Sequence, residues 1–194
     1  MGTFYEDNAT EFFHATVDVD MTPIYEKFLP LIPHGGHILD AGCSSGRDAR
    51  HFLASGYEVT AFDASRELCE LASEHLGADV HCLRFEDVER QAPFDAVWAC
   101  ASLLHVPRAQ LQEAFDRLVR AVKVGGVLYI SFKLGAGERQ KGGRHFTDLD
   151  ESGLQELIDA SGKLQLIEQW RTEDRRPDRD DTWLNALVRK ASSM

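Results

Sequence analysis

The sequence predicts an α/β protein with a doubly wound, mostly parallel sheet of seven strands that a C-terminal antiparallel hairpin completes. Two observations predict this fold. Short apolar runs of strand type alternate with longer runs of helical period along most of the chain, which is the pattern of right-handed βαβ crossovers. The last two apolar runs are joined by a polar, turn-like segment without a helix, so they should pair antiparallel.

The composition indicates one globular domain. The 194 residues are 43% hydrophobic and 27% charged, and these values exclude disordered and collagen-like chains. The length favours a single domain over residues 1–194. The 21 basic and 32 acidic side chains give a net charge of −11, which argues against a partner bound mainly through phosphates. We therefore expect no nucleic-acid partner.

Features of membrane, secreted and metal-binding proteins do not appear in the sequence. No apolar run has the length of a membrane span, and the first 20 residues lack the basic start and apolar core of a signal peptide. The four cysteines, at positions 43, 69, 82 and 100, match no zinc motif. We expect four reduced thiols in a cytoplasmic protein, no metal, no membrane partner, and either a monomer or a homodimer.

The strands and helices are expected in the following order. A short helix at 22–31 enters through Pro23 and precedes the first strand. The strands are predicted at 37–41, 58–62, 80–85, 94–99, 127–133, 164–171 and 183–189. The helices between them are predicted at 47–55, 67–76, 107–123 and 151–161.

Local signals set the ends of two of these helices. Ser65 is a candidate N-cap for the helix at 67–76, and Gly77 would end it. Pro107 opens the next helix, and Gly125-Gly126 would close it. Each boundary follows from a residue that satisfies or removes a backbone group at a helix terminus.

Two segments have less regular patterns. Residues 1–21 contain several aromatic side chains, and we expect them to fold over the ligand site as an N-terminal cap, with packing on the sheet as the alternative. Residues 133–146 mix glycines with basic side chains, which predicts a mobile lid or substrate loop at the carboxyl edge of the sheet. A plain solvated loop is the alternative for this segment.

The first strand ends in LDAGCSSGRD, from Leu39 to Asp48, and runs directly into a helix. Ligands of open α/β sheets bind at the carboxyl ends of strands, so this is the expected ligand loop. Gly42 permits close approach of the backbone, and Gly46 lets the helix begin near the strand. The glycines are spaced GxxxG rather than GxGxxG, and Asp40 would repel a pyrophosphate but suit an ammonium or sulfonium group.

Asp63 ends the second strand and follows Gly46 by 63 − 46 = 17 residues. This is close to the roughly 20-residue spacing at which a carboxylate meets ribose hydroxyls in nucleotide sites. A carboxylate accepts two hydroxyl donors and repels a 2′-phosphate. The predicted ligand therefore carries an unphosphorylated ribose and no pyrophosphate.

In order and spacing, the segments LDAGCSSGRD, AFDAS, FDAVWACASLLHV and KVGGVLYISFK resemble class I S-adenosylmethionine-dependent methyltransferases. The resemblance covers residues 22–190, and the family's sheet has seven strands with the last pair reversed. The compact size and the GRD helix start resemble the small-molecule members, including the tellurite-resistance type. The resemblance implies S-adenosylmethionine as cofactor, S-adenosylhomocysteine as product, and a small-molecule methyl acceptor.

The resemblance also implies the residues that would bind the cofactor. One group would surround its methionine and ribose: Asp40, Gly42, Cys43, Gly46, Arg47, Asp63 and, facing the methyl group, Ala99. A second group would lie against the adenine: Ala64, Phe85 and Glu86. Because Arg84 stands where the family usually has a carboxylate, Asp87 and the Phe85 backbone are alternatives to Glu86.

The candidate catalytic residues come from the acceptor side. His105 and His145 are the candidate bases if the acceptor must lose a proton. Arg144 is included because the local positive charge of its loop suits an anionic or electron-rich acceptor. The Asn/Asp-Pro-Pro-aromatic motif of base and amide methyltransferases is absent after the fourth strand, and Cys100 follows Ala99 rather than a proline. Both facts point away from nucleic-acid acceptors.

Two other functions fit the sequence less well. A degenerate domain that binds the cofactor, or nothing, without catalysis is favoured by Ser44 and Arg84, which depart from the family pattern. A serine at position 44 is small enough to be tolerated in the loop if its φ is negative. A Rossmann-type NAD-dependent oxidoreductase would require GxGxxG and no carboxylate at position 40.

Overall fold

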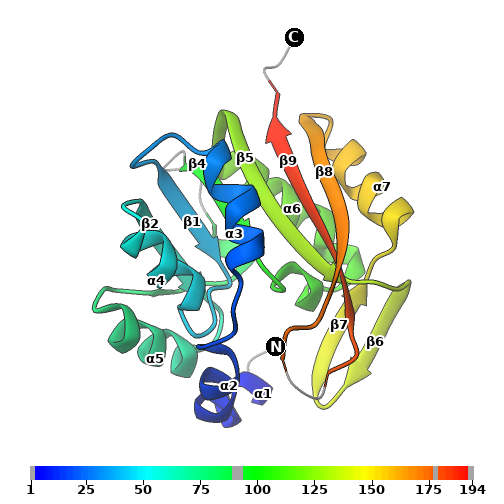
Figure 1. The fold of residues 1–194 in the computed structure, drawn as a ribbon. Coiled ribbons are helices and arrows are strands. Elements are labelled where there is room, and N and C mark those ends of the chain that lie inside the picture. The colour runs from blue at the N-terminus through cyan, green and yellow to red at the C-terminus, as the bar shows by residue number, and fades with distance from the viewer. Residues whose placement is uncertain (1–2, 89–93, 177–178, 192–194) are drawn as a thin grey trace.

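A seven-stranded sheet runs through the middle of the molecule in the order β3-β2-β1-β4-β5-β9-β8 (Figure 1). This computed structural model describes residues 3–88, 94–176 and 179–191. The strands are β1 (His37–Ala41), β2 (Glu58–Asp63), β3 (His81–Cys82), β4 (Phe94–Ala99), β5 (Val122–Lys133), β8 (Leu164–Glu173) and β9 (Thr182–Lys190). All neighbours pair parallel except β9, which is antiparallel to both β5 and β8. The predicted fold class, including the C-terminal hairpin, is confirmed.

Helices cover both faces of this sheet. They are α1 (Thr3–Asp7), α2 (Ala9–Thr16), α3 (Thr22–Phe28), α4 (Arg47–Ala54), α5 (Arg66–Leu76), α6 (Arg108–Ala121) and α7 (Glu151–Ser161), with short 3₁₀ turns at η1 (Leu29–Leu31), η2 (Phe85–Asp87) and η3 (Leu103–His105). The predicted caps of α5 are present, because the Ser65 side chain accepts from the Leu68 amide and Gly77 has a left-handed φ of +64°.

Alternation along the strands divides the core between the two faces. Ile38 packs with α3 and α4 in one buried cluster, whereas its neighbour Leu39 packs with α6 and α7 in another. Adjacent strand residues point to opposite faces of a sheet, so a strand buried on both faces is apolar at consecutive positions. In Figure 1, α3 lies in front of the sheet and α6 behind it.

The strand order creates a switch point beside β1. Its two neighbours are β2 and β4, and the helices that follow β1 and β4 pack on opposite faces. The loops that leave these two strands therefore diverge at their carboxyl ends, which is where open α/β sheets bind ligands. The fold places the candidate site at this edge, toward α1, α2 and the hairpin described below (Figure 1).

Two predicted boundaries were wrong. Helix α6 ends at Ala121 rather than at Gly125-Gly126, and the residues from Val122 onward extend β5, with Val122 opposite Phe94. A Cβ on Gly126 would lie 2.6 Å from the carbonyl oxygen of Asp95, so this glycine serves strand packing rather than a helix end. The third strand is limited to two exposed residues at the sheet edge, His81 and Cys82, and the 3₁₀ turn η2 begins at Phe85, the last residue of the predicted strand.

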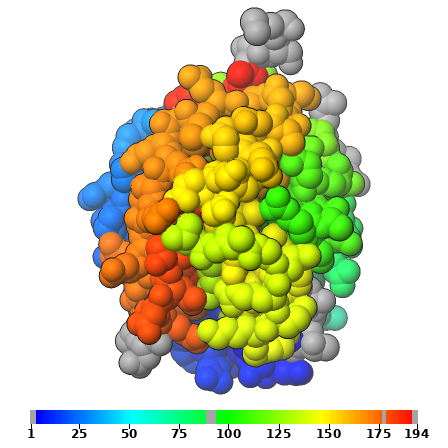
Figure 2. Space-filling view, turned by 90° about the vertical axis from the view of Figure 1, so that its right-hand side faces the viewer, coloured from blue at the N-terminus to red at the C-terminus, as the bar shows by residue number. Residues whose placement is uncertain are grey.

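The predicted loop at 133–146 is largely an antiparallel hairpin. Its strands are β6 (Gly137–Lys141) and β7 (Arg144–Asp148), and Gly142-Gly143 joins them with positive φ at both residues. This turn allows only residues that tolerate positive φ, so the Gly-Gly pair was a sequence signal for a two-residue hairpin. Figure 2 shows the hairpin in yellow-green, beside β8 and β9 and above the N-terminal segment.

The N-terminal residues form helices α1 and α2, which pack against α5. Met1 and Gly2 of the expected cap at 1–21 lie outside the described residues. Tyr5 and Phe12 of this segment line the cavity described in the next section. None of the helices in the described part of the chain is both long and apolar enough to cross a bilayer.

The N-cap of helix α7 can be tested by its contribution to the stability of the protein. The Asp150 side chain accepts a hydrogen bond of 2.8 Å from the Gly153 amide, which would otherwise lack a partner. Asp150→Ala should lower the free energy of unfolding by about 1 kcal/mol, measured by urea denaturation. Asp159→Ala, an exposed position in the last turn of the same helix, is the control and should change stability by less than about 0.5 kcal/mol. Equal losses in the two variants would contradict the cap.

Candidate functional site

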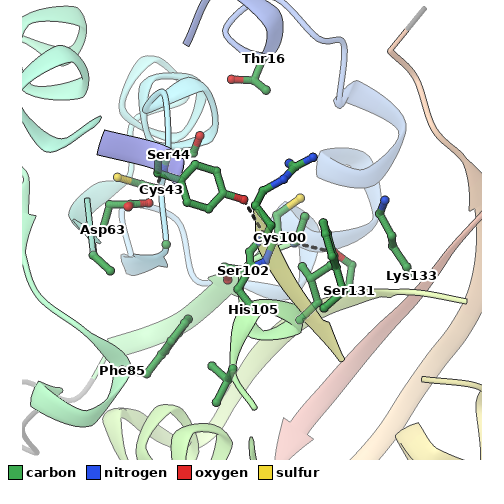
Figure 3. Close-up of a pocket in the computed structure, with 18 of the residues that line it drawn as sticks. Thr16, Cys43, Ser44, Asp63, Phe85, Cys100, Ser102, His105, Ser131 and Lys133 are labelled. Atoms are coloured by element: carbon green, nitrogen blue, oxygen red, sulfur yellow. Dashed lines mark hydrogen bonds between the residues drawn. The ribbon is translucent and has the colours of Figure 1, made fainter. Parts of the chain in front are cut away.

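A cavity of about 820 Å³ opens at the carboxyl ends of β1, β2, β4 and β5. Figure 3 shows Asp63, Cys43 and Ser44 on one side, Ser131 and Lys133 on the other, and Cys100, Ser102 and His105 between them. The β6–β7 hairpin and the N-terminal helices complete the wall. A cavity of this volume can hold a nucleoside-sized ligand together with a second small molecule.

The ends of β1 and β4 approach each other closely at Gly42. A Cβ at this position would lie 2.5 Å from the Cβ of Ser102, and Gly42 has a φ of +81°. The Ser102 hydroxyl donates to the carbonyl of Ala41 at 2.6 Å, and the Ala101 amide donates to Ser131 Oγ at 2.8 Å. Ala101 itself is held at a φ of +52°, a conformation that costs free energy and is frequent at functional sites.

Asp63 presents a buried carboxylate to the cavity from the end of β2. Its two oxygens accept from the amides of Ser44 and Ser65, each at 2.9 Å. Burial raises the pKa of Asp63, although the amide hydrogen bonds oppose this shift. No cation of the described residues pairs with this side chain, so its remaining lone pairs are available to hydroxyl donors of a ligand.

The condition of a negative φ at Ser44 is not met, because this residue has a φ of +52°. The left-handed conformation aims the Ser44 amide at Asp63, and this hydrogen bond offsets part of the backbone strain. The Ser44 hydroxyl is buried at the cavity without a hydrogen-bond partner. A serine here can therefore take the place of a glycine and still offers a free polar group.

Asp40 lies beneath the loop and does not line the cavity. Burial and the nearby Asp48 carboxylate hold the pKa of Asp40 well above its usual range, and one of its oxygens has no hydrogen-bond partner. Because the Asp40 side chain does not line the cavity, it could affect the binding of a ligand only indirectly. It supports the start of α4 through the hydrogen bond that it accepts from the Ala49 amide.

Asp48 is a cavity residue that the sequence reasoning missed. Its buried carboxylate accepts from Trp98 Nε1 at 2.8 Å, from the Tyr25 hydroxyl, and from Arg47 Nε at 2.7 Å. Burial alone would raise the pKa of Asp48, but the Arg47 guanidinium and these donors hold it below its usual range. The GRD sequence contained the signal, because a carboxylate beside a predicted ligand arginine can fix the direction of its guanidinium.

Arg47 projects from the start of α4 into the cavity. Asp48 binds two of its nitrogens, and a third nitrogen donates to the Thr16 carbonyl at 3.4 Å. These contacts link the β1–α4 loop to the N-terminal segment. The orientation of the guanidinium is thus set by two elements that lie far apart in the sequence.

The predicted adenine residues line one end of the cavity. Ala64 and Phe85 contribute apolar surface, and the Phe85 ring meets Phe62 edge-on with centroids 5.6 Å apart. Glu86 also lines this end, whereas Asp87 accepts from the Arg84 amide at 3.1 Å and so closes the turn η2. Of the two alternative carboxylates, Glu86 is the one that lines the cavity, where Arg84 Nη1 lies 3.5 Å from Glu86 Oε1.

The remaining predicted cofactor residues differ in position. Cys43 lines the cavity, and burial keeps the pKa of its thiol well above the ordinary range, which leaves it a neutral, apolar group. Gly46 and Ala99 do not line the cavity. Gly46 has a φ of +73°, and a Cβ on it would press against Leu76 and Ala72 of α5. It therefore governs how the helices pack behind the loop.

His105 faces the cavity from η3 within a short chain of hydrogen bonds. Its Nδ1 lies 2.8 Å from the carbonyl oxygen of His145 and its Nε2 lies 2.8 Å from the Tyr5 hydroxyl. A carbonyl only accepts, so Nδ1 carries the proton and Nε2 accepts from Tyr5. Burial, with Arg144 and Lys133 nearby, lowers the pKa of His105 to about 4. The imidazole is neutral at pH 7 and can accept a proton.

The other two predicted catalytic residues lie on β7. The ring of His145 is engaged within the hairpin, with Nε2 3.2 Å from both Glu138 Oε1 and Thr147 Oγ1, and only its carbonyl meets His105. Arg144 lies over the rings of Phe4 and Phe146. Burial raises the pKa of Tyr5, and the positive charge of Arg144 opposes this larger effect. Tyr5, which the sequence reasoning did not single out as a site residue, is therefore hydrogen-bonded to His105 and lies within reach of the charge of Arg144.

Comparison with known proteins gives a consistent result. Residues 38–126 match a family described as methyltransferase domain. A ubiquinone biosynthesis O-methyltransferase of Xanthomonas axonopodis pv. citri is 30% identical over 187 residues, which cover 78% of this chain and 74% of that protein. Its counterpart from Xylella fastidiosa is 33% identical over 112 residues, which cover 54% of this chain and 44% of that protein. The chain thus spans about half the length of several curated relatives that it matches.

A solved structure shares the fold over nearly the whole chain. It is the 1,6-didemethyltoxoflavin-N1-methyltransferase of Burkholderia thailandensis, solved with 1,6-didemethyltoxoflavin and S-adenosylhomocysteine bound. The TM-score is 0.77 at 23% identity, and the match covers 96% of this chain and 87% of that one. The same arrangement of sheet and helices therefore occurs in a protein with a different sequence.

The lowered pKa of His105 can be measured directly. A folded-state pKa of about 4 means that the ring stays neutral on acidification from pH 7 to pH 5, while an unburied histidine gains its proton near pH 6.5. Titration of the imidazole ¹⁵N shifts by NMR, with the signal assigned through His105→Gln, should show no protonation of this ring above pH 5. A midpoint above pH 6 would contradict the burial and the hydrogen-bond chain.

Proposed function

Because the chain belongs to the class I S-adenosylmethionine-dependent methyltransferases, we propose that it transfers a methyl group from S-adenosylmethionine to a small-molecule acceptor. S-adenosylmethionine supplies an electrophilic methyl group on a positively charged sulfur. The protein has to hold a nucleophile in line with that methyl group and keep water away, which are effects of position rather than of covalent catalysis. The cavity of about 820 Å³ at the switch point suits this task.

The observation that carries the proposal is the carboxylate of Asp63. It is buried at the cavity, it is oriented by two amides, and it has no cationic partner among the described residues. A buried carboxylate in this state favours a ligand that brings hydroxyl donors, as a ribose diol does. Phe85 and Ala64 at the same end offer apolar surface to a base, and Glu86 can accept from an exocyclic amino group.

Arg47 and Asp48 support the other end of the cofactor. The guanidinium of Arg47 enters the cavity with its direction fixed by Asp48, and it can bind the carboxylate of an amino-acid moiety. Ser44 adds a buried hydroxyl that has no hydrogen-bond partner among the described residues. A methionine moiety carries both an ammonium and a carboxylate, so it can match Asp48 and Arg47 together, whereas a pyrophosphate has no cationic group for Asp48.

For an acceptor that must lose a proton, we propose His105 as the general base. Tyr5 donates its proton to His105 Nε2, and its oxygen can in turn accept a proton from an acceptor hydroxyl. The proton would then pass from the acceptor to the Tyr5 oxygen while the Tyr5 proton passes to Nε2. The His145 carbonyl holds the required tautomer. Curated relatives named as O-methyltransferases support an oxygen nucleophile.

Four expectations from the sequence stay predictions: the tellurite-resistance-like subtype, the cytoplasmic location, the absence of a nucleic-acid partner and the oligomeric state. The assignment of residues 1–21 as a cap is also part of the proposal. It is supported by Tyr5, Phe12 and Thr16, which lie along the cavity wall.

Calorimetric titration tests the cofactor. We expect S-adenosylhomocysteine to bind with a micromolar dissociation constant, and Asp63→Ala to weaken it by a factor of about 10² or more, because a buried charge-assisted contact is lost. Asp79→Ala removes an exposed carboxylate beyond α5 and is the matched control, with unchanged binding expected. Binding of NAD alone would refute the methyltransferase function. If neither ligand binds, the degenerate-domain alternative is supported instead.

The proposed base is tested in two variants. For a hydroxyl acceptor, His105→Gln should lower kcat by about 10²- to 10⁴-fold, the range of a lost general base. Tyr5→Phe should also lower kcat, because it interrupts the relay, while the affinity of both variants for S-adenosylhomocysteine should remain as in the wild type. Methyl transfer is measured by the release of S-adenosylhomocysteine over a panel of phenols and hydroxy acids. Unchanged kcat in His105→Gln would rule out the base.

A further inference from the structure

Three cations surround the ring of Phe146 at the acceptor end of the cavity. Lys133 Nζ lies 4.8 Å from the ring centroid, and the guanidinium carbons of Arg139 and Arg144 lie 4.7 Å and 5.2 Å from it. They come from β5, β6 and β7, so the fold assembles this cluster from three strands. Such a concentration of positive charge is unusual for a chain with a net charge of −11.

Two of these cations, and the nearby Arg176, already have carboxylate partners. Lys133 pairs with Asp181 at 2.5 Å, Arg176 pairs with Asp174 at 2.5 Å, and Arg139 pairs with Asp148. Among the described residues these pairs neutralise most of the local charge. Arg144 differs, because no carboxylate of the described residues forms an ion pair with it.

Glu138 of the same hairpin is a carboxylate that could have paired with Arg144, but it has other partners. Its oxygen accepts from the Arg108 amide at 2.8 Å and lies 3.2 Å from the ring of His145. The Arg144 side chain is half-buried, and its Nε atom is buried without a hydrogen-bond partner among the described residues. A buried donor without a partner is costly, and an anion bound beside Arg144 would supply that partner.

The aromatic side chains hold the Arg144 guanidinium in place. Phe4 of α1 lies with its centroid 4.6 Å from the guanidinium carbon, and Phe146 of β7 also lies against it. The planar fork is therefore oriented before any ligand arrives, and a planar carboxylate is the group that it binds in two parallel hydrogen bonds. The surrounding rings, including Tyr5 and Trp183 in the cavity wall, favour a flat molecule.

From this arrangement we infer that the methyl acceptor is a planar, preferably aromatic, carboxylic acid whose carboxylate pairs with Arg144. This inference rests on the proposed function, and it specifies the acceptor class. Tyr5, which lies within reach of the charge of Arg144, donates to His105, so an acid held by Arg144 would lie near the proposed base. The carboxylate would anchor the acceptor, while a neighbouring hydroxyl would lose its proton to the relay and attack the methyl group.

The test uses the full chain saturated with S-adenosylhomocysteine and titrates matched probes by calorimetry. The matched pairs are salicylate with salicylamide and protocatechuate with its amide. Phenylphosphonate is added as an anion that is not a carboxylate. In the wild type we expect at least one acid to bind about tenfold or more tightly than its amide, the effect of one charge-assisted pair. Arg144→Gln should reduce this preference to about threefold or less.

Lys141→Gln is the matched control. It removes one positive charge from the residue that lies opposite Arg144 in the hairpin register, but its side chain is exposed and does not line the cavity. The acid preference should survive in this variant. The affinity of Arg144→Gln for S-adenosylhomocysteine verifies that it is folded, and Arg144→Lys, which keeps the charge without the planar fork, should retain part of the preference.

The outcomes separate this inference from the proposed function. If wild-type protein does not bind S-adenosylhomocysteine, the proposed function fails. If the cofactor product binds but the amides bind as well as the acids, if no acid binds, or if the acid preference persists in Arg144→Gln, only the carboxylate inference is overturned. Tighter binding of phenylphosphonate that depends on Arg144 would also overturn it, in favour of a phosphonate or phosphate acceptor.

Discussion

The close approach of two strand ends is the constraint on which the rest of the site depends. Gly42 after β1 and Ser102 after β4 are so near that no Cβ fits at position 42. This contact brings the two loops together at their origin, while the helices that follow them pack on opposite faces of the sheet. The loops must therefore separate beyond this point, and the cavity is the space between them. Strain at Ser44 and Ala101, both with positive φ, accompanies the same contact.

Charge in this site is organised by burial. Asp48 stays ionised because Arg47, Tyr25 and Trp98 all donate to it, whereas Asp40, a short distance below, has a raised pKa. The pKa values of two neighbouring buried carboxylates are thus shifted in opposite directions, because one has several donors and the other has few. At the opposite end, carboxylates of the described residues pair with Lys133 and Arg139 beside Phe146 but not with Arg144. The two ends of the cavity consequently offer contrasting surroundings to a cofactor and to an acceptor.

Much of the fold could be predicted from the sequence. The strands at 37–41 and 94–99 and the helix at 151–161 have the predicted bounds, because hydrophobic period and local caps decide them. The end of α6 could not be predicted, because the pairing of Val122 with Phe94 overrides the local helical pattern. Of the site, the loop from Gly42 to Arg47 and the carboxylate of Asp63 were identified by spacing. Tyr5 and Asp48 were missed, since their importance arises from contacts with distant residues.

The sequence by itself determined the fold class, the family and the position of the glycine-containing loop after β1, because apolar periodicity, turn glycines and short motifs act over a few residues. Only the tertiary structure decided which groups meet in the cavity. The hydrogen bond between Tyr5 and His105 joins residues 100 positions apart, and the contact of Arg144 with Phe4 joins the hairpin to the N-terminal helix. The lowered pKa of His105 follows from burial among such distant neighbours, as does the lack of a hydrogen-bond partner for Arg144 Nε among the described residues, and no local pattern encodes either.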